Sequence, residues 1–254
     1  MNLEGKVALV SGGLGDIGRA IAVALTERGA KVALCDIREP SDAEREALIN
    51  PAIRTNIVDV RNAVAVERWV TEVADVWGTP DLIIPNAAVV TLTDILSIDP
   101  DAWERELAVN LSGAFYLAQA AAKRLVSEGK AGRIVFVGSW AAQVSHPHVP
   151  AYSVAKAGLR MLGKTMALSL APYGILVNEV APGYVDAGLS AEVFRQEPER
   201  RTRAEQVVPV GTLITPEEVA QAVAYLCDPS NRQMTGSVLL LDGGLSLRGG
   251  GGDA

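Results

Sequence analysis

Cysteine and histidine are both scarce in this chain of 254 residues. The two cysteines, Cys35 and Cys227, are too few for a disulfide framework, so a reducing compartment, the cytoplasm, is expected. The two histidines, His146 and His148, flank one proline, and their spacing suggests no third ligand. Because a metal site needs at least three protein ligands, we expect no bound metal.

The chain also lacks the features of membrane proteins and nucleic-acid-binding proteins. No apolar run reaches the ~20 residues that span a bilayer, and the first residues are not typical of a secretory signal. The net charge is −7 and the pI is near 5.0, with no basic cluster that would attract nucleic acid. We therefore expect neither a membrane nor a nucleic acid as a partner.

Aromatic residues make up only 5% of the chain, whereas hydrophobic residues make up 49%. Small aliphatic side chains dominate, which suits helices packed closely on a sheet. The length fits one large α/β domain. We expect this domain over residues 1–247, followed by a flexible, glycine-rich tail over residues 248–254.

Short apolar runs alternate with longer segments of helical periodicity. Several runs are continuous in Val, Ile and Leu, as in strands buried on both faces of a parallel sheet. The expected strands are residues 6–11, 31–36, 52–58, 81–85, 132–138, 174–180 and 237–242. The expected helices are residues 17–28, 63–77, 101–127, 151–171 and 216–226. This succession predicts a doubly wound parallel sheet with helices on both faces.

A glycine-rich loop, residues 11–18, follows the first expected strand and opens the first helix. Glycine lets the backbone approach a pyrophosphate closely, and the free N–H groups of a helix N-terminus bind it. A plain strand-to-helix turn can contain the same glycines, so the loop alone does not decide between them. The residues expected to bind a dinucleotide here are Ser11, Gly12, Leu14, Gly15, Asp16, Ile17 and Gly18.

Asp36 ends the second expected strand, close to the ~20-residue spacing at which an acid accepts the ribose hydroxyls of a dinucleotide. A carboxylate there favours NAD and repels the extra phosphate of NADP. Arg38 is the opposing signal, because a nearby arginine can hold that phosphate. We expect NAD as the cofactor, with NADP less favoured, and expect Asp36 and Ile37 to contact it.

Tyr152 and Lys156 are four residues apart in an expected helix and therefore lie on one face of it. A free tyrosine has a pKa of about 10, which is too high for a base at neutral pH. A nearby ammonium stabilises the phenolate and lowers that pKa. Such a pair also arises by chance on exposed helices, so its companions decide its meaning.

With these motifs in this order, the chain resembles the short-chain dehydrogenase/reductase family from Lys6 to Gly244. The resemblance implies one Rossmann domain with a seven-stranded parallel sheet. Ser11 replaces the threonine of the family's glycine loop, and Asp16 replaces its middle glycine. A carboxylate beside the pyrophosphate would be repulsive, so we expect the Asp16 side chain to turn outward or to cap helix amides.

The resemblance also assigns cofactor contacts elsewhere in the chain. These positions match the family's adenine-contacting pair, a segment that borders the cofactor, and a segment that holds the carboxamide. They are Asp59, Val60, Asn86, Ala87, Ala88, Pro182, Gly183 and Val185, together with Tyr152 and Lys156.

Ser139 and Asn110 match the two remaining catalytic positions of the family. By resemblance, Ser139 hydrogen-bonds the substrate oxygen and Lys156 hydrogen-bonds the nicotinamide ribose. Asn110 shapes a bend in a long helix and holds a water that connects Lys156 to solvent. Tyr152 then takes the substrate's proton in oxidation and returns it in reduction.

The sequence thus predicts an NAD-dependent oxidoreductase that interconverts a secondary alcohol, in a polyol, a sugar or a small hydroxy compound, and its ketone. One alternative is an NADPH-dependent 3-oxoacyl-carrier-protein reductase, which Asp36 and the acidic net charge disfavour. The other is a non-catalytic dinucleotide-binding sensor, which the presence of Tyr152 and Lys156 disfavours.

Four residues are candidates for contact with the substrate: Trp140, Gln143, His146 and Tyr184. Packing beneath the loop explains the first two equally well. Residues 187–208 are expected to form a mobile lid, where specificity commonly resides. By resemblance, the last strand belongs to a subunit interface, which implies a homodimer or a homotetramer.

Overall fold

The computed structural model describes residues 1–248 except 189, 192, 193 and 195–197. Seven parallel strands form one sheet in the order β3-β2-β1-β4-β5-β6-β7. Their bounds are β1 Val7–Ser11, β2 Lys31–Asp36, β3 Ile53–Ile57, β4 Leu82–Ile84, β5 Gly132–Val137, β6 Ile175–Pro182 and β7 Val238–Leu241. The predicted Rossmann fold is confirmed, with all seven strands at the expected places.

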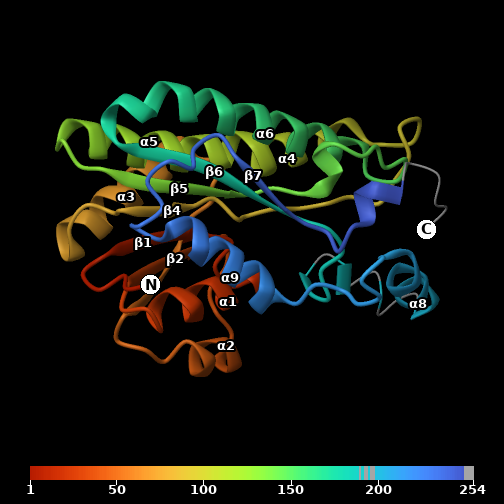
Figure 1. Cartoon of the computed structure of the whole chain (residues 1–254), viewed down its shortest axis with the longest axis horizontal. Coiled ribbons are helices and arrows are strands. Elements are labelled where there is room, and N and C mark those ends of the chain that lie inside the picture. Colours follow the sequence, from red (N-terminus) through yellow and green to blue (C-terminus); the bar gives the residue numbers. More distant parts are fainter. Residues whose placement is uncertain (189, 192–193, 195–197, 249–254) are drawn as a thin grey trace.

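Helices cover both faces of this sheet (Figure 1). The α-helices are α1 Asp16–Thr26, α2 Asp42–Ala47, α3 Ala63–Trp77, α4 Pro100–Leu107, α5 Ala114–Ser127, α6 Pro150–Leu170, α8 Pro198–Val207 and α9 Pro216–Cys227. Shorter turns are η1 Ala108–Gly113, η2 Trp140–Ala142, η3 Ala171–Tyr173 and η4 Leu245–Arg248. Helices α1 and α9 pack together on one face, and α3, α5 and α6 cover the other.

The apolar strands divide their side chains between two cores. In β1, Ala8 and Val10 belong to the core beneath α1 and α9, whereas Val7 and Leu9 belong to the core beneath α3, α5 and α6. Successive side chains of a strand point to opposite faces, so a strand covered on both sides must be apolar throughout. This burial explains the continuous apolar runs of the sequence.

Three elements differ from the sequence prediction. The helix expected over residues 101–127 is interrupted by η1, a π-helical segment between α4 and α5. Helix α2 was not predicted, because none of its residues is buried and it therefore has no apolar stripe. Helix α8 was also missed and falls within the expected lid. Part of the rest of that lid lies outside the described residues. Residues 249–254 of the expected tail lie entirely outside them.

The strand order reverses direction between β1 and β4, which are direct neighbours. In open parallel sheets, ligands bind beyond the carboxyl ends of the strands at such a switch point. The glycine loop after β1 and the segment after β4 meet at this place. Within the described part of the chain, every helix is too short or too polar to cross a membrane.

Candidate active site

The glycine loop has no room for side chains at several of its positions, including Gly12 and Gly18. Gly12 has a φ of 63°, and a Cβ atom there would lie 2.7 Å from Cα of Ala87. A Cβ atom on Gly18 would overlap the carbonyl oxygen of Gly12. The loop therefore needs glycine at both positions to fold tightly between β1 and α1.

The segment after β4 is joined to the end of β1 by side chains. Ser11 Oγ accepts hydrogen bonds from the amides of Asn86 and Ala87, at 3.0 and 3.2 Å. Asn86 Nδ2 donates in return to the carbonyls of Ser11 and Gly12. These reciprocal contacts fix the two loops at the switch point, and Ala88 follows directly in the same segment.

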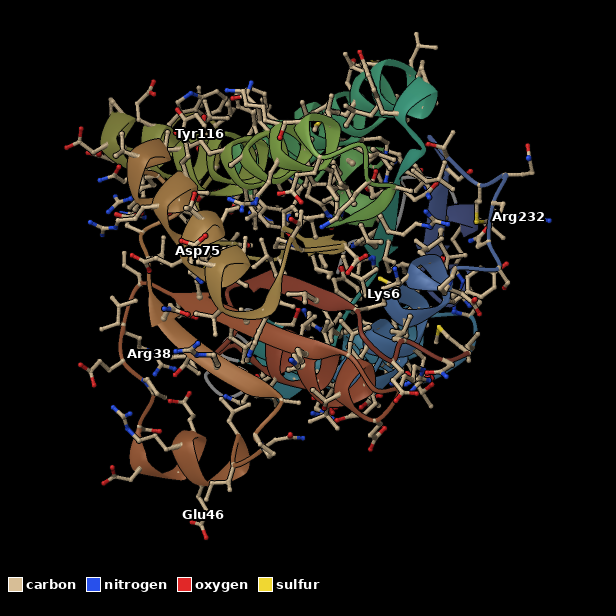
Figure 2. All side chains as sticks on the ribbon, turned by 90° about the vertical axis from the view of Figure 1, so that its left-hand side faces the viewer. Lys6, Arg38, Glu46, Asp75, Tyr116 and Arg232 are labelled. Atoms are coloured by element: carbon tan, nitrogen blue, oxygen red, sulfur yellow. The ribbon has the colours of Figure 1, made fainter. Side chains whose placement is uncertain are left out.

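Asp36 lies at the carboxyl end of β2 with its carboxylate turned toward the glycine loop. Its Oδ2 accepts from the amide of Leu14 at 3.2 Å, and its Oδ1 accepts from the amide of Ile37 at 2.8 Å. Arg38 is turned to α2, where Glu44 accepts two hydrogen bonds from its guanidinium at 2.6 and 2.8 Å. Figure 2 shows Arg38 between the sheet and α2, whereas Glu46 extends from α2 away from the sheet.

Asp16 turns outward, which is one of the two arrangements expected for it. Its carboxylate pairs with Arg19 on the next turn of α1 and accepts from the amide of Gly188 at 2.8 Å. The structure shows no side-chain cap at the start of α1, where Gly15 is the N-cap residue. The first amides of α1 are thus left for a ligand, which fits the pyrophosphate of a dinucleotide.

The remaining expected cofactor contacts lie at the carboxyl edge of the sheet or next to it. Asp59 forms an ion pair with Arg61, whose hydrogen bonds lower the pKa of Asp59. Val60 is buried against the π-helical segment, where a Cβ atom on Gly113 would lie 2.7 Å from it. Pro182 ends β6, Gly183 follows it, and Val185 pairs with Ile214 in an isolated bridge.

Asn110 lies inside the π-helical segment η1 and is almost fully buried. Its Oδ1 accepts from the amide of Val89, and its Nδ2 donates to the carbonyl of the same residue, both at 2.8 Å. π-helical turns inside α-helices are frequent at functional sites. Asn110 thus lies where the long helix is interrupted, and its side chain fixes the segment after β4 from the helical side.

Ser139 follows the end of β5 and is buried. Its Oγ accepts from the amide of Ala141 at 3.1 Å and so caps the short turn η2. Because this contact uses a lone pair, the hydroxyl hydrogen remains available for another oxygen. The Ser139 hydroxyl lowers the pKa of the Tyr152 phenol, against the larger effect of burial.

Tyr152 and Lys156 lie on α6, and Lys156 Nζ is 5.4 Å from the centre of the Tyr152 ring. The amine donates to the carbonyl of Val137 at 2.8 Å and is buried. Burial raises the pKa of Tyr152 to about 12; the charge of Glu106 acts in the same direction, and the hydrogen bond with Ser139 acts against it. In the chain without a cofactor, burial is therefore the largest influence on the pKa of Tyr152, and the lowering expected from Lys156 stays a prediction.

The four expected substrate contacts divide into two groups. Trp140 is buried and packs with Val208 and Leu245, so it has the packing role that the sequence also allowed. His146 and Tyr184 stack edgewise on Trp140, at 4.4 and 5.4 Å between ring centres. Burial lowers the pKa of His146 and raises that of Tyr184.

Gln143 is exposed, and its side-chain oxygen accepts from Arg160 at 2.9 Å.

Three charged residues near this site were not predicted from the sequence. Glu106 is fully buried, one helical turn before Asn110, and accepts from the amide of Thr91 at 2.6 Å. Arg160 lies one turn after Lys156 and pairs with the buried Glu179 of β6. The spacing of four residues from an expected catalytic residue was the available signal for Glu106 and Arg160.

A comparison with protein families explains why these site residues occur together. A family model described as enoyl-(acyl carrier protein) reductase matches residues 13–246. The chain belongs to the short-chain dehydrogenase/reductase family. The match covers the glycine loop from residue 13 on, the π-helical segment, Ser139 and the Tyr152–Lys156 pair in one domain.

Several characterised relatives are similar over nearly the whole chain. A sorbitol dehydrogenase of Cereibacter sphaeroides is 32% identical over 252 residues, 96% of this chain and 98% of that protein. An L-rhamnose-1-dehydrogenase of Scheffersomyces stipitis is 31% identical over 250 residues, 96% of both chains. A 3-oxoacyl-[acyl-carrier-protein] reductase of Vibrio cholerae is 33% identical over 247 residues, 97% of this chain and all of that protein.

Solved structures of the family have the same fold. A short-chain dehydrogenase/reductase of Mycobacterium marinum superposes with a TM-score of 0.89 at 30% identity, covering 96% of this chain and 97% of that one. A putative 2-deoxy-D-gluconate 3-dehydrogenase of Agrobacterium tumefaciens, solved with bound NADP, gives 0.88 at 30% identity, covering 97% and 98%. This short-chain dehydrogenase/reductase is therefore an oxidoreductase of CH–OH groups that uses a nicotinamide dinucleotide.

Proposed function

We propose that the chain is an NAD-dependent dehydrogenase that interconverts a secondary alcohol and its ketone, with a polyol, a sugar or a small hydroxy compound as substrate. The arrangement of Ser139, Tyr152 and Lys156 beyond the carboxyl end of the sheet, beside the glycine loop, carries this proposal. The sorbitol and L-rhamnose dehydrogenases among the relatives support the substrate class.

In the proposed reaction, Tyr152 handles the proton of the substrate hydroxyl. Ser139 keeps its own hydroxyl hydrogen for the substrate oxygen, because its Oγ already accepts from the amide of Ala141. A nicotinamide dinucleotide, when bound, supplies the hydride acceptor or donor and, in the oxidised form, a positive ring charge. Tyr152 takes the proton in oxidation and returns it in reduction.

Lys156 is the second group of the proposed site that can give or take a proton. Burial lowers its pKa to about 8, and the charge of Glu179 acts against this shift. An amine with such a pKa exchanges a proton readily near neutral pH. Its place on the carbonyl of Val137, beneath the Tyr152 ring, suits the role of proton store and of donor to the nicotinamide ribose.

The preference for NAD rests on the charges around Asp36. The Leu14 amide fixes its carboxylate toward the glycine loop. In that position the carboxylate accepts hydrogen bonds from the ribose hydroxyls of NAD and repels the 2′-phosphate of NADP. Arg38, the residue that could hold that phosphate, is bound by both oxygens of Glu44. The solved structure from Agrobacterium tumefaciens holds NADP, so the activities of this chain with NAD and with NADP need to be compared directly.

The test is a panel of polyols, sugars and small alcohols with NAD or NADP, followed by the absorbance of the reduced nicotinamide. The proposal expects turnover of a secondary alcohol, faster with NAD. Faster reduction of a 3-oxoacyl thioester with NADPH would instead identify a carrier-protein reductase, the activity of the Vibrio cholerae relative. Tight NAD binding without turnover on the panel would indicate a sensor.

We also propose a cytoplasmic homo-oligomer, a dimer or a tetramer. The two cysteines are free and buried, which suits a reducing compartment. Large apolar side chains are exposed on α6 and α9, among them Met161, Leu168 and Tyr225. Light scattering at several protein concentrations measures the mass, and a monomer throughout would contradict this proposal.

A further inference from the structure

A buried ion pair joins α6 to β6 beside the active site. Arg160 Nε and Nη2 donate to the two carboxylate oxygens of Glu179, both at 3.0 Å. The side chains are 11% and 4% exposed. Removing two charges from water costs several kcal/mol per ion, so a hydrophobic pair of equal volume would often be as stable. The pair therefore calls for an explanation other than stability.

The guanidinium of Arg160 also holds the turn that carries Ser139. Its Nη2 donates to the carbonyl oxygen of Ser139 at 3.1 Å, and its Nη1 donates to Oε1 of Gln143 at 2.9 Å. One planar group thus binds a carboxylate, a backbone carbonyl and an amide oxygen, which the point charge of a lysine cannot do. Because arginine only donates, the amide of Gln143 is fixed with its oxygen toward Arg160 and its N–H2 group on the other side.

The residue before Ser139 is adapted to this ion pair. A Cβ atom on Gly138 would overlap Oε1 of Glu179 and lie 2.6 Å from its Cδ. The carboxylate therefore occupies the space that a side chain at residue 138 would need. On α6 the spacing of four residues places Tyr152, Lys156 and Arg160 on one face of the helix.

We propose that Arg160 and Glu179 are positioning residues, which hold the Ser139 turn against Tyr152 and present the N–H2 group of Gln143 to an acceptor oxygen of the substrate. The inference rests on the proposed function, because in that function Ser139 of this turn binds the substrate oxygen. The acceptor would be a hydroxyl or carbonyl oxygen next to the reacting carbon, as in a polyol or a sugar.

The deciding variant is Arg160→Lys, which keeps the charge beside Glu179 but removes the fork that reaches Ser139 and Gln143. The matched control is Arg133→Lys, since Arg133 also donates to two carbonyls, of Gly132 and Asn231, at the far end of β5. Hydrogen exchange of a peptide over residues 138–147 should become faster in the first variant and stay unchanged in the second. Unchanged exchange in Arg160→Lys would overturn the proposal, whether or not the wild type turns over any substrate.

Turnover provides the second readout. Arg160→Lys should lower kcat by about 10–100-fold, since small misplacements of reacting groups cost that much, and leave NADH binding unchanged. The same substitution in a Ser139→Ala background should cost clearly less, because the contribution of the positioned Ser139 is already lost and only that of Gln143 is left to lose. An equal loss in both backgrounds, or a kcat like that of the wild type, would refute the positioning role. If Arg160→Lys does not fold, the neutral pair Arg160→Met with Glu179→Gln replaces it in both measurements.

Discussion

Replacing Gly138 with alanine gives a sharp test of packing beside the active site. The φ of Gly138 is not in the left-handed region, so the backbone itself accepts alanine. The added Cβ atom, however, would lie 2.6 Å from Cδ and 2.8 Å from Cγ of Glu179, and Arg160 holds that side chain in place. Overpacking costs about 1–3 kcal/mol, and loosening a buried ion pair adds to it, so we expect a loss of about 3 kcal/mol.

The loss should appear as a fall of roughly 6–12 °C in the unfolding temperature, since 1 kcal/mol corresponds to about 2–4 °C in a domain of this size. Differential scanning calorimetry at fixed protein concentration measures it. The control is Gly163→Ala on the same helix as Arg160, where the new Cβ atom would be 3.5 Å from Cδ2 of Phe136, an ordinary contact. That variant should gain up to about 1 kcal/mol from helix propensity.

A background without the ion pair completes the test. In the double variant Arg160→Met and Glu179→Ala, the space beside residue 138 is open, and Gly138→Ala should then cost less than about 1 kcal/mol. If Gly138→Ala were as stable as the wild type, or equally destabilising in both backgrounds, the contact with Glu179 would not be the cause.

Three further predictions concern the chemistry. Tyr152→Phe should lower turnover by at least about 100-fold, the usual contribution of a general acid or base, without weakening NADH binding measured by fluorescence. Because burial raises the pKa of Tyr152 to about 12, its base form is scarce at neutral pH. The kcat/KM for oxidation should therefore rise with pH by up to about tenfold per unit, whereas the kcat/KM for reduction should not rise with pH. Asp36→Ala should lower the Kd for NADP relative to that for NAD by about tenfold or more, measured by titration calorimetry, because a like charge beside the 2′-phosphate is removed. A normal turnover, a flat oxidation profile or an unchanged Kd ratio would contradict the respective assignment.

The fold could be predicted from the sequence because the central strands of its sheet are buried on both faces. The continuous apolar runs indicated most of the strands, although β3, with the sequence IRTNI, is largely exposed. The cap residues marked helix starts: Thr215 accepts from the amide of Glu218, and Asp99 from that of Asp101. Helix α2 could not be predicted in the same way. It is stabilised by its capping box and by surface ion pairs, which leave no apolar period in the sequence.

The active site could be predicted only as far as its residues share a regular spacing. Tyr152 and Lys156 are one helical turn apart, and the contact between Asp36 and the Leu14 amide joins two motifs that the spacing had already related. The partners of Arg160 lie in two separate segments, the turn over residues 139–143 and strand β6 with Glu179, and only the folded sheet brings these together. Contacts of that kind have no period that a sequence pattern can show.

The acidity of Tyr152 shows where reasoning from spacing ends. A spacing of four residues between a phenol and an amine predicts that the ammonium lowers the pKa of the tyrosine. In the folded chain, however, Lys156 Nζ donates to the Val137 carbonyl, and burial and the charge of Glu106 raise the pKa of Tyr152. The protein groups alone therefore keep Tyr152 protonated at neutral pH, which suits a proton donor in reduction. Oxidation needs further positive charge near the phenol, and the oxidised nicotinamide ring carries one whereas the reduced ring does not. It follows that NAD⁺ should lower the pKa of Tyr152 more than NADH does, so difference absorbance of the phenolate against pH should show an earlier transition in the complex with NAD⁺.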